Sequence, residues 1–416
     1  MSPRGRILLA LCTVALAIGA LVGLSSLYPG TDAAAKRAEA VARSADAPAR
    51  LAGSSGCDPA RAHDAGDFDQ TITSGDWTRS FILHVPPSYE GDSPTPLVLS
   101  LHGLGGGASQ HAGYSNLPSK ADEEGFILVS PQGVSTEFLR SSHWNFLRFL
   151  PFAPDDVLFI DDLLDDIGSQ LCVDEARIFV AGISMGAMMA TRLACDLSDR
   201  IAAIAPVAGV YYPPWSSDLD AEADCVSVRP VPVVAFHGTA DIVVPFEGGT
   251  VGLEGFPFTL RNIELDVMPT WAEHNGCQGE PATQPVTEGV TLLRYDDCNA
   301  DATVALYIID GGRHDWPGAQ TRDEISATDL LWEFFQVHQL AYLAGDANCD
   351  GSVNSVDASL VLQQSAGLLA TVSCPSEADV NGDGVIDSRD AALLLQHDAG
   401  LLPEFEPAAQ SQRGSR

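Results

Sequence analysis

Short apolar segments alternate with longer amphipathic segments across residues 77–343 of the 416-residue chain. Most of the short segments are continuously apolar, as expected for strands that are buried on both faces of a parallel sheet. The predicted strands are Phe81–Val85, Leu97–Leu101, Phe126–Ser130, Arg177–Ala181, Ile201–Val207, Pro232–Phe236 and Val304–Ile309. Helices are predicted at Asp155–Leu171, Met185–Leu197 and Ser326–Leu343. This alternation predicts an α/β fold in which helices cover both faces of one sheet.

The first 56 residues have a different pattern. Arg4 and Arg6 precede an apolar run of 18 residues, 7–24, and small residues that include Ala33–Ala35 follow it. This order predicts a signal peptide over residues 1–35 and a secreted, extracellular protein. The run is also near the lower length limit of a membrane span, so an uncleaved anchor at the cell surface is the alternative. Residues 36–56 are rich in Ala and Ser and predict a tether.

Export changes how the cysteines are interpreted. Eight of the nine cysteines follow the predicted signal, and an even number in an oxidising compartment favours disulfides. Cys349 and Cys374 lie in one acidic segment and are predicted to pair. The other six allow 15 connectivities. Proximity in the sequence favours the pairs Cys195–Cys225 and Cys277–Cys298, which leaves Cys57–Cys172.

The charge balance excludes some classes of partner. The chain has 56 acidic and 22 basic residues, a net charge of −34, and 45% hydrophobic residues. That hydrophobic fraction is ordinary for a folded protein. The shortage of Lys and Arg argues against nucleic-acid binding and against docking on an anionic membrane. Nine acidic residues and one basic residue fall within residues 345–402, so this segment needs its own explanation.

The sequence Gly182-Ile183-Ser184-Met185-Gly186 lies between a predicted strand and a predicted helix. A nucleophile elbow requires this context, because its serine sits on a turn too tight for β-carbons on either side. The amino terminus of the helix directs free N–H groups toward developing negative charge. Ser184 is therefore the candidate nucleophile, and an ordinary glycine-rich turn is the alternative.

A serine nucleophile needs a histidine base that a carboxylate orients, and in this fold the chain order is Ser, acid, His. Asp241 and His314 each lie in a loop that directly follows a predicted strand. Carboxyl ends of parallel strands meet at one edge of a sheet, so we expect Ser184, Asp241 and His314 to lie together there. Asp310 and Asp315 are rival acids, but their proximity to His314 in the sequence favours a solvated position.

Backbone N–H groups are expected to bind the oxyanion of the reaction. One belongs to Met185, directly after the nucleophile. The other is assigned to Leu104, in the glycine-rich loop at residues 102–107 that follows a predicted strand. Glycines let a backbone approach a substrate closely. A flexible loop or a phosphate cradle is the alternative, but no Gly-Lys-Ser follows to bind a phosphate.

These motifs together resemble one family. The segments HGLGGG, PQG with WN, VDEARIFVAGISMGAMMATRLAC, VPVVAFHGTADIVVPFEGG and GGRHDWPG resemble, in this order, the secreted polyhydroxybutyrate depolymerases and feruloyl esterases close to carbohydrate esterase family one. The resemblance covers residues 57–343 and implies a three-layer α/β-hydrolase that needs no cofactor for catalysis. It implies the triad Ser184, Asp241 and His314.

The resemblance also implies that Trp144 and Trp316 line the ester cleft, with core packing as the alternative. Family members often have other residues where this chain has Met185 and Arg313, so the pocket wall is expected to differ.

Residues 346–402 contain an internal repeat with an offset of 33 residues. Side-chain oxygens recur at loop positions 1, 3, 5, 9 and 12, with glycine at position 6 and a backbone carbonyl at position 7, which is the EF-hand arrangement for Ca²⁺. The candidate ligands are Asp346, Asn348, Asp350, Ser352, Asn354 and Asp357 in the first loop, and Asp379, Asn381, Asp383, Val385, Asp387 and Asp390 in the second. A solvated acidic tail, the alternative, does not explain a match that occurs twice.

Aspartate at position 12 and the lack of a full helix before either loop resemble a type I dockerin, a small all-α duplicated Ca²⁺ module. The resemblance implies two Ca²⁺ ions and a cohesin-type protein partner for residues 345–402. Positions 10 and 11 are Ser355-Val356 in the first loop and Ser388-Arg389 in the second, so the two halves are not equivalent. Residues 403–416 are predicted to form a disordered tail.

The leading hypothesis is a secreted serine esterase that acts on feruloyl or acetyl esters of a plant polysaccharide such as xylan and is tethered through the dockerin. An extracellular polyhydroxybutyrate or other polyester depolymerase is the alternative within the same family. A serine peptidase would use the same triad, and a non-catalytic assembly protein would use the domain as a passive scaffold. The acidic surface favours neutral esters over polyanionic substrates.

Overall fold

The computed structural model describes residues 54–57, 59–137, 140–148, 153–212, 225, 227–253, 256–318, 325–340, 344–348, 353–372, 374–402 and 405. The chain forms two compact units, one over residues 50–353 and one that contains residues 354–416. The predicted signal peptide, most of the tether and all but one residue of the predicted tail lie outside the described residues. Within the described part, no helix has the length and apolar character to cross a membrane.

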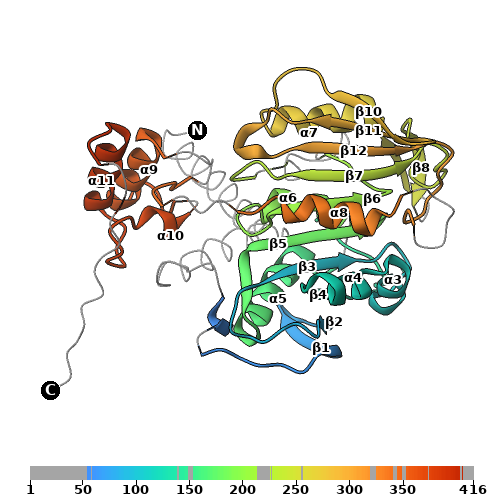
Figure 1. Ribbon diagram of the computed structural model, residues 1–416, viewed down its shortest axis with the longest axis horizontal. Helices are drawn as coiled ribbons and strands as arrows, with labels where there is room; N and C mark the ends of the chain where they lie inside the picture. The colour runs from blue at the N-terminus through green and yellow to red at the C-terminus, as the bar shows by residue number, and fades with distance from the viewer. Residues whose placement is uncertain are drawn as a thin grey trace, which may run out of the picture. The chain divides into compact units, whose positions relative to one another are not determined.

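A ten-stranded sheet forms the centre of the first unit, in the order β1-β2-β4-β3-β5-β6-β7-β12-β11-β10 (Figure 1). The strands are β1 (Gly66–Ser74), β2 (Trp77–Val85), β3 (Thr95–Leu101), β4 (Ile127–Pro131), β5 (Val173–Ile183), β6 (Ala203–Val207), β7 (Val233–Gly238), β10 (Ala282–Thr287), β11 (Val290–Tyr295) and β12 (Val304–Ile309). The six central strands from β4 to β12 are parallel. Antiparallel strands extend both edges, and β8 (Gly249–Leu253) and β9 (Phe256–Leu260) form a separate hairpin.

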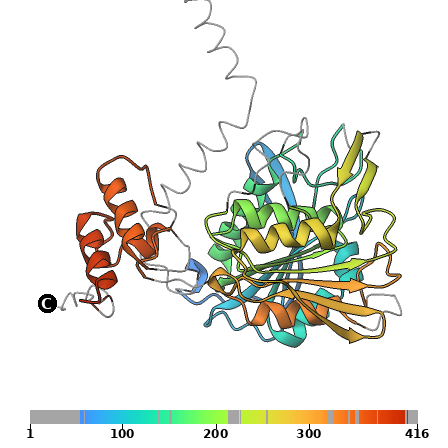
Figure 2. The same cartoon turned by 90° about the horizontal axis from the view of Figure 1, so that it is seen from above.

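Helices cover both faces of this sheet (Figure 2). They are α3 (Ala108–Ser115), α4 (Leu117–Glu124), α5 (Asp156–Gln170), α6 (Met185–Asp196), α7 (Met268–His274) and α8 (Ala327–Gln336), with short helical turns at Ser55–Cys57, Ile263–Val267 and Asn299–Asp301. On one face, Ile160 of α5, Leu193 of α6 and Trp271 of α7 join one apolar cluster. On the other face, Leu117 of α4 and Phe335 of α8 join a second cluster. The unit is therefore a three-layer α/β-hydrolase fold, as predicted.

The apolar pattern predicts the centre of the sheet but not its edges. Each predicted strand overlaps an observed strand, and the predicted helices correspond to α5, α6 and α8. The edge strands β1 and β10 escape the prediction because their side chains are mostly exposed or half-buried, and their residues are largely polar.

The helix predicted over residues 326–343 is wrong at its carboxyl end. α8 ends at Gln336. The backbone N–H of Leu340 then donates to the carbonyl of Ala176 at 2.8 Å, so the chain leaves the helix and joins the start of β5. At the other end of this unit, the N–H of Ser54 donates to the carbonyl of Val173 at 2.9 Å.

Three of the predicted disulfides are confirmed. The structure contains Cys57–Cys172, Cys195–Cys225 and Cys277–Cys298. Cys374 is also disulfide-bonded. Its predicted partner, Cys349, lies outside the described residues, so that pairing stays a prediction.

The second unit is helical, with α9 (Ser355–Ser365), α10 (Pro375–Ala378) and α11 (Ser388–Asp398). α9 packs against α11. The buried side chains include Ala358 and Val361 on α9 and their repeat counterparts Ala391 and Leu394 on α11. Equivalent positions of the sequence repeat are therefore buried in both helices.

Candidate active site

Ser184 lies at the sharp turn between β5 and α6. Its backbone has φ 57° and ψ −120°, a region that residues with a β-carbon rarely adopt and that marks functional strain. The backbone N–H of Ser184 donates to the carbonyl of Val207 at 2.9 Å, which holds the turn against β6. The serine therefore occupies the strained elbow position that its sequence context predicts, directly before the first N–H of α6.

Gly186, two residues after Ser184, occupies a position that has no room for a side chain. A β-carbon at this position would lie 2.1 Å from the carbonyl oxygen of Leu101 and 2.6 Å from that of His102. The start of α6 therefore touches the end of β3, which leads into residues 102–107. We call these residues the oxyanion loop.

We expect Gly186→Ala to lower the melting temperature and kcat/KM together. The added methyl group would push β3 and the oxyanion loop away from α6, at a cost of about 1–3 kcal/mol for overpacking. A displacement of about 1 Å at a catalytic group can cost about 100-fold in rate. Gly113→Ala is the matched control, because a β-carbon added there would meet no atom within 4 Å. Equal melting temperatures and rates for both variants would contradict the close approach.

His314 and Asp241 form a hydrogen-bonded pair at the same edge of the sheet. Asp241 follows β7 and His314 follows β12, the neighbouring strand. The distance from His314 Nδ1 to Asp241 Oδ2 is 2.7 Å. The other carboxylate oxygen of Asp241 accepts the backbone N–H groups of Val243 and Val244 at 2.8 and 2.9 Å. The acid predicted from chain order is thus the one that contacts the histidine.

The electrostatics keep Asp241 ionised. Burial alone would raise its pKa, but the hydrogen bond and charge of His314 and the two N–H donors outweigh burial and lower the pKa below its ordinary value. His237, on β7, lies beneath this group. Its Nε2 is 2.8 Å from the carbonyl of Val244, and burial lowers its pKa, so it is a neutral donor that steadies the Asp241 loop. Chain position alone did not reveal this role.

Ser184 and His314 are not hydrogen-bonded in this structure, as far as the described residues show. Such contacts are often long in enzymes without substrate and tighten when substrate binds. The rival acids have other partners. Asp315 accepts from the hydroxyl of Tyr114 at 3.4 Å, and Asp310 accepts from Thr239 at 3.2 Å.

The oxyanion loop lies against the nucleophile. A β-carbon on Gly103 would lie 3.3 Å from Cβ of Ser184. Leu104 is 37% exposed at the surface, and Met185 is buried at the start of α6. The residue before Leu104 therefore lies against Ser184, and Met185 directly follows Ser184 in the chain.

The two tryptophans are buried and do not form an open wall of a cleft. Both are 0% exposed. The indole N–H of Trp144 donates to the carbonyl of His102 at 2.8 Å, and that of Trp316 donates to the hydroxyl of Thr328 at 2.9 Å. The structure thus favours the core-packing alternative over the expectation of direct substrate contact.

Comparison with known proteins gives related enzymes. Feruloyl esterase B of Piromyces equi is 33% identical over 237 residues, which cover 57% of this chain and 42% of that protein. "Putative esterase NocK" of Nocardia uniformis subsp. tsuyamanensis is 30% identical over 256 residues, which cover 58% of this chain and 71% of that protein. The chain belongs to the esterases of the α/β-hydrolase fold. Feruloyl esterase C of Emericella nidulans is 28% identical over 264 residues, 62% of this chain and 83% of that protein.

Two family models also match parts of this chain. The Phospholipase/Carboxylesterase model matches residues 156–278, which include Ser184 and Asp241. The dockerin type I domain model matches residues 344–397, so the acidic segment is a dockerin. The chain spans less than half the length of the Piromyces protein.

The two halves of the dockerin repeat begin their helices with the same capping arrangement. Asn354 directly precedes α9 and Asp387 directly precedes α11, and each side chain caps the helix that follows it. Asp357 and Asp390 complete the capping boxes and are 0% exposed. These residues were predicted as calcium ligands at positions 9 and 12 of the two loops, so the structure places equivalent residues in equivalent positions.

The second loop has a donor set that suits calcium. Asp379 accepts the N–H groups of Asp383 and Gly384, and Asp390 accepts those of Asn381 and Asp387, so carboxylates close the loop from both ends. Carboxylate and carbonyl oxygens are the ligands that Ca²⁺ prefers. Dockerin domains bind calcium, and these residues fit it. Asp350 and Ser352 of the first loop lie outside the described residues.

The carboxylates do not yet converge on one point. In the described part of the chain, no three His, Cys, Asp or Glu side chains are grouped closely enough to hold a metal ion. Arg389 instead contacts two predicted ligands of the second loop. Its guanidinium lies 2.9 Å from Asp383 and 2.8 Å from Asp387. Arg389 therefore occupies carboxylate oxygens that the sequence assigns to a calcium ion.

Proposed function

We propose that this protein is a secreted serine esterase that hydrolyses neutral carboxylic esters, feruloyl or acetyl groups on a plant polysaccharide. The observation that carries the proposal is the 2.7 Å contact between His314 and Asp241, at the same sheet edge as the strained Ser184 turn. The names of two related proteins, feruloyl esterases B and C, support the substrate class.

In the proposed reaction, Ser184 Oγ attacks the ester carbonyl carbon and His314 Nε2 accepts its proton. Asp241 accepts the Nδ1–H of His314, which leaves Nε2 unprotonated and able to act as a base. The N–H groups of Leu104 and Met185 stabilise the oxyanion. His314 then protonates the departing alcohol, and water releases the acyl group from Ser184 by the same steps in reverse.

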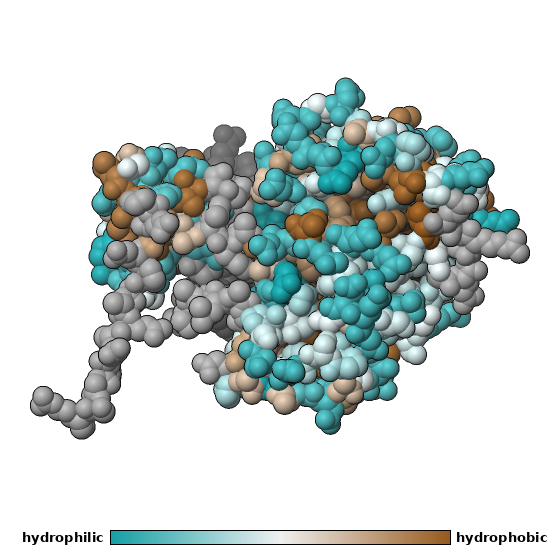
Figure 3. Space-filling model, viewed as in Figure 1, coloured by the Kyte–Doolittle hydropathy of each residue, from teal (hydrophilic) through white to brown (hydrophobic). Residues whose placement is uncertain are grey.

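Exposed aliphatic side chains beside the catalytic acid support an apolar acyl group. Ile242 is 89% exposed and Val243 is 52% exposed, and both directly follow Asp241. Figure 3 shows apolar atoms gathered near the ends of β7 and β8 on an otherwise largely hydrophilic face. An aromatic acyl chain such as a feruloyl group can cover such side chains, whereas an acetyl group is too short to reach far beyond the serine.

A substrate panel tests the proposal. Purified protein is assayed on feruloylated xylan, acetylated xylan, hydroxybutyrate oligomers and a peptide amide of matched length. Turnover of the polysaccharide esters with little turnover of the amide supports it. Turnover of the polyester alone would identify a depolymerase instead, and equal turnover of amide and ester would identify a peptidase.

We also propose that the protein is extracellular and binds a cohesin-type protein through residues 345–402. The three disulfides support an oxidising compartment. The dockerin match supports the partner class. Two Ca²⁺ ions are proposed, one for each repeated loop, and calorimetry on the full chain should measure about two ions per molecule. Asp350→Ala combined with Asp383→Ala should abolish that binding.

Arg389→Val should tighten calcium binding in the second loop. The change gives the second loop the residue that the first has at the same position, Val356, and removes the cation that contacts Asp383 and Asp387. The gain should be on the order of threefold, because exposed ion pairs are weak. Calcium titration by calorimetry measures it, and Val356→Arg is the converse variant. Unchanged or weaker binding in Arg389→Val would show that the arginine does not compete.

A further inference from the structure

The carbonyl of Gly103 is held by two donors. His102 Nδ1 lies 2.8 Å from this oxygen, and the backbone N–H of Gly106 donates to it at 3.0 Å. The same peptide unit carries the N–H of Leu104, the proposed oxyanion donor. A peptide unit is planar and trans, so its C=O and N–H point in opposite directions. Holding the carbonyl therefore fixes the direction of the Leu104 N–H.

The tautomer of His102 follows from its other contact. The backbone N–H of Gly133 can only donate, and it lies 2.9 Å from His102 Nε2. Nε2 is therefore the acceptor, and the proton is on Nδ1, where it points at the Gly103 carbonyl. His102 is 1% exposed, and burial lowers its pKa, which keeps the ring neutral. The ring thus connects the oxyanion loop to the segment that begins at Gln132.

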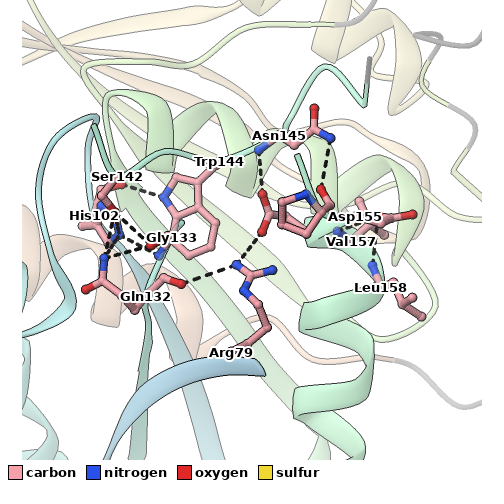
Figure 4. A network of polar contacts seen from close by, with 12 residues as sticks. Arg79, His102, Gln132, Gly133, Ser142, Trp144, Asn145, Asp155, Val157 and Leu158 are labelled. Atoms are coloured by element: carbon pink, nitrogen blue, oxygen red, sulfur yellow. Dashed lines mark hydrogen bonds and ion pairs between the residues drawn. The ribbon is translucent and has the colours of Figure 1, made fainter. Parts of the chain in front are cut away.

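Gln132 contacts the start of the oxyanion loop, as Figure 4 shows, and also the residue that follows the loop. Its Nε2 lies 2.8 Å from Ser142 Oγ and 3.2 Å from His102 Nε2. Its Oε1 accepts the N–H of Ala108, the first residue of α3, at 2.9 Å. The backbone N–H of Gly105 donates to the carbonyl of Ser142 at 2.7 Å. The Gln132 side chain therefore contacts the first residue of the oxyanion loop and the first residue of α3, which follows the loop.

The segment is itself anchored to a buried ion pair (Figure 4). Arg79 lies 2.6 Å from Asp156 and 3.4 Å from the carbonyl of Gln132. Asp156 also accepts the backbone N–H of Asn145 at 2.6 Å. Arg79 and Asp156 are each 1% exposed. Neither Gln132 nor Asn145 can therefore shift without disturbing a buried charge.

We infer that Gln132 is a positioning residue that, through His102, holds the Gly103–Leu104 peptide with its N–H ready for the oxyanion. This inference rests on the proposed function, and it explains how the oxyanion donor of Leu104 is oriented before substrate binds. Preorganised donors stabilise the transition state without reorganisation during the reaction. Gln132 contacts no reacting atom, so its loss should lower kcat more than it raises KM.

The test compares Gln132→Ala and Gln132→Glu with the wild type. Glutamate keeps the acceptor for Ala108 but loses the donor to Ser142. Each variant is assayed for kcat and KM on one ester. Each is also assayed for inhibition by a trifluoromethyl ketone, whose serine adduct places an oxyanion in the site. Gln170→Ala is the control, because that side chain bonds Asp166 on α5 and should leave all values unchanged.

We expect kcat to fall about 10- to 100-fold in both variants with KM within about threefold, and ketone affinity to fall by the same factor as kcat/KM. A kcat within twofold of wild type in Gln132→Glu, or losses that follow the melting temperature with no selective loss of ketone affinity, would overturn the inference. If Gln132→Ala does not fold, Gln132→Glu and Ser142→Ala decide. A wild type with no ester turnover would refute the proposed function instead, so the two failures are distinct.

Discussion

Ser184→Ala should lower kcat for ester hydrolysis by about 10⁶-fold, the loss typical for removal of a serine nucleophile. The variant removes only the hydroxyl, and the contacts that hold the turn are made by the backbone N–H and carbonyl of residue 184. Alanine also has a β-carbon, so the strain at φ 57° is the same. The melting temperature should therefore change little.

Covalent labelling distinguishes this loss from a general defect. A fluorophosphonate probe should modify the wild type and leave Ser184→Ala unmodified, as measured by intact mass. Ser119→Ala, a serine on α4 away from the elbow, is the control and should label like the wild type. Persistent labelling of Ser184→Ala would move the nucleophile to another residue, and an unlabelled wild type would favour the non-catalytic assembly hypothesis.

Asp241→Asn should lower kcat by about 10⁴-fold at neutral pH, because it reverses the tautomer of His314. The carboxylate now accepts the proton of His314 Nδ1. An asparagine that presents its NH₂ group instead would favour the ring with its proton on Nε2, where it cannot accept the proton of Ser184. The carboxamide oxygen would keep the bonds from Val243 and Val244, so the loop should stay folded.

The rival acids provide the controls for this variant. Asp310→Asn and Asp315→Asn should keep kcat within about threefold of the wild type, since neither carboxylate contacts His314. Steady-state kinetics and thermal melting of the three variants are compared side by side. A larger loss in Asp315→Asn than in Asp241→Asn would reassign the acid of the triad.

The sequence predicts the Asp241–His314 pair well because both residues directly follow predicted strands. Asp241 and His314 each follow a continuous apolar strand, and parallel strands bring such loops to one edge. The elbow at Ser184 is equally visible, because both glycines of the motif are required by close backbone contacts. In the dockerin, the repeated spacing predicts equivalent positions in the two loops, and the structure places a capping box at the same position in each.

Residues that act across the fold are harder to predict. Gln132 and Ser142 contact the oxyanion loop from a segment about 30 residues away in sequence, and no periodic pattern signals such a contact. The resemblance marked the neighbouring Trp144 as a cleft residue, but the structure buries it beneath the loop. The sequence signals for Gln132 are its place in the PQG motif of the resemblance and its position directly after the apolar segment that forms β4, and neither signal indicates what its side chain contacts.

The attachment of residues 57 and 340 to the start of β5 sets how the hydrolase unit would carry a pulling force. Cys57 is bonded to Cys172, and Leu340 donates to Ala176, so both attachments lie within a few residues of one another. Tension applied between these two points would pass through this short connection, bypassing the other strands. Ser184 lies at the opposite end of β5, roughly 35 Å away at the usual rise per residue. A force applied at these two points would thus leave the catalytic edge of the sheet unloaded.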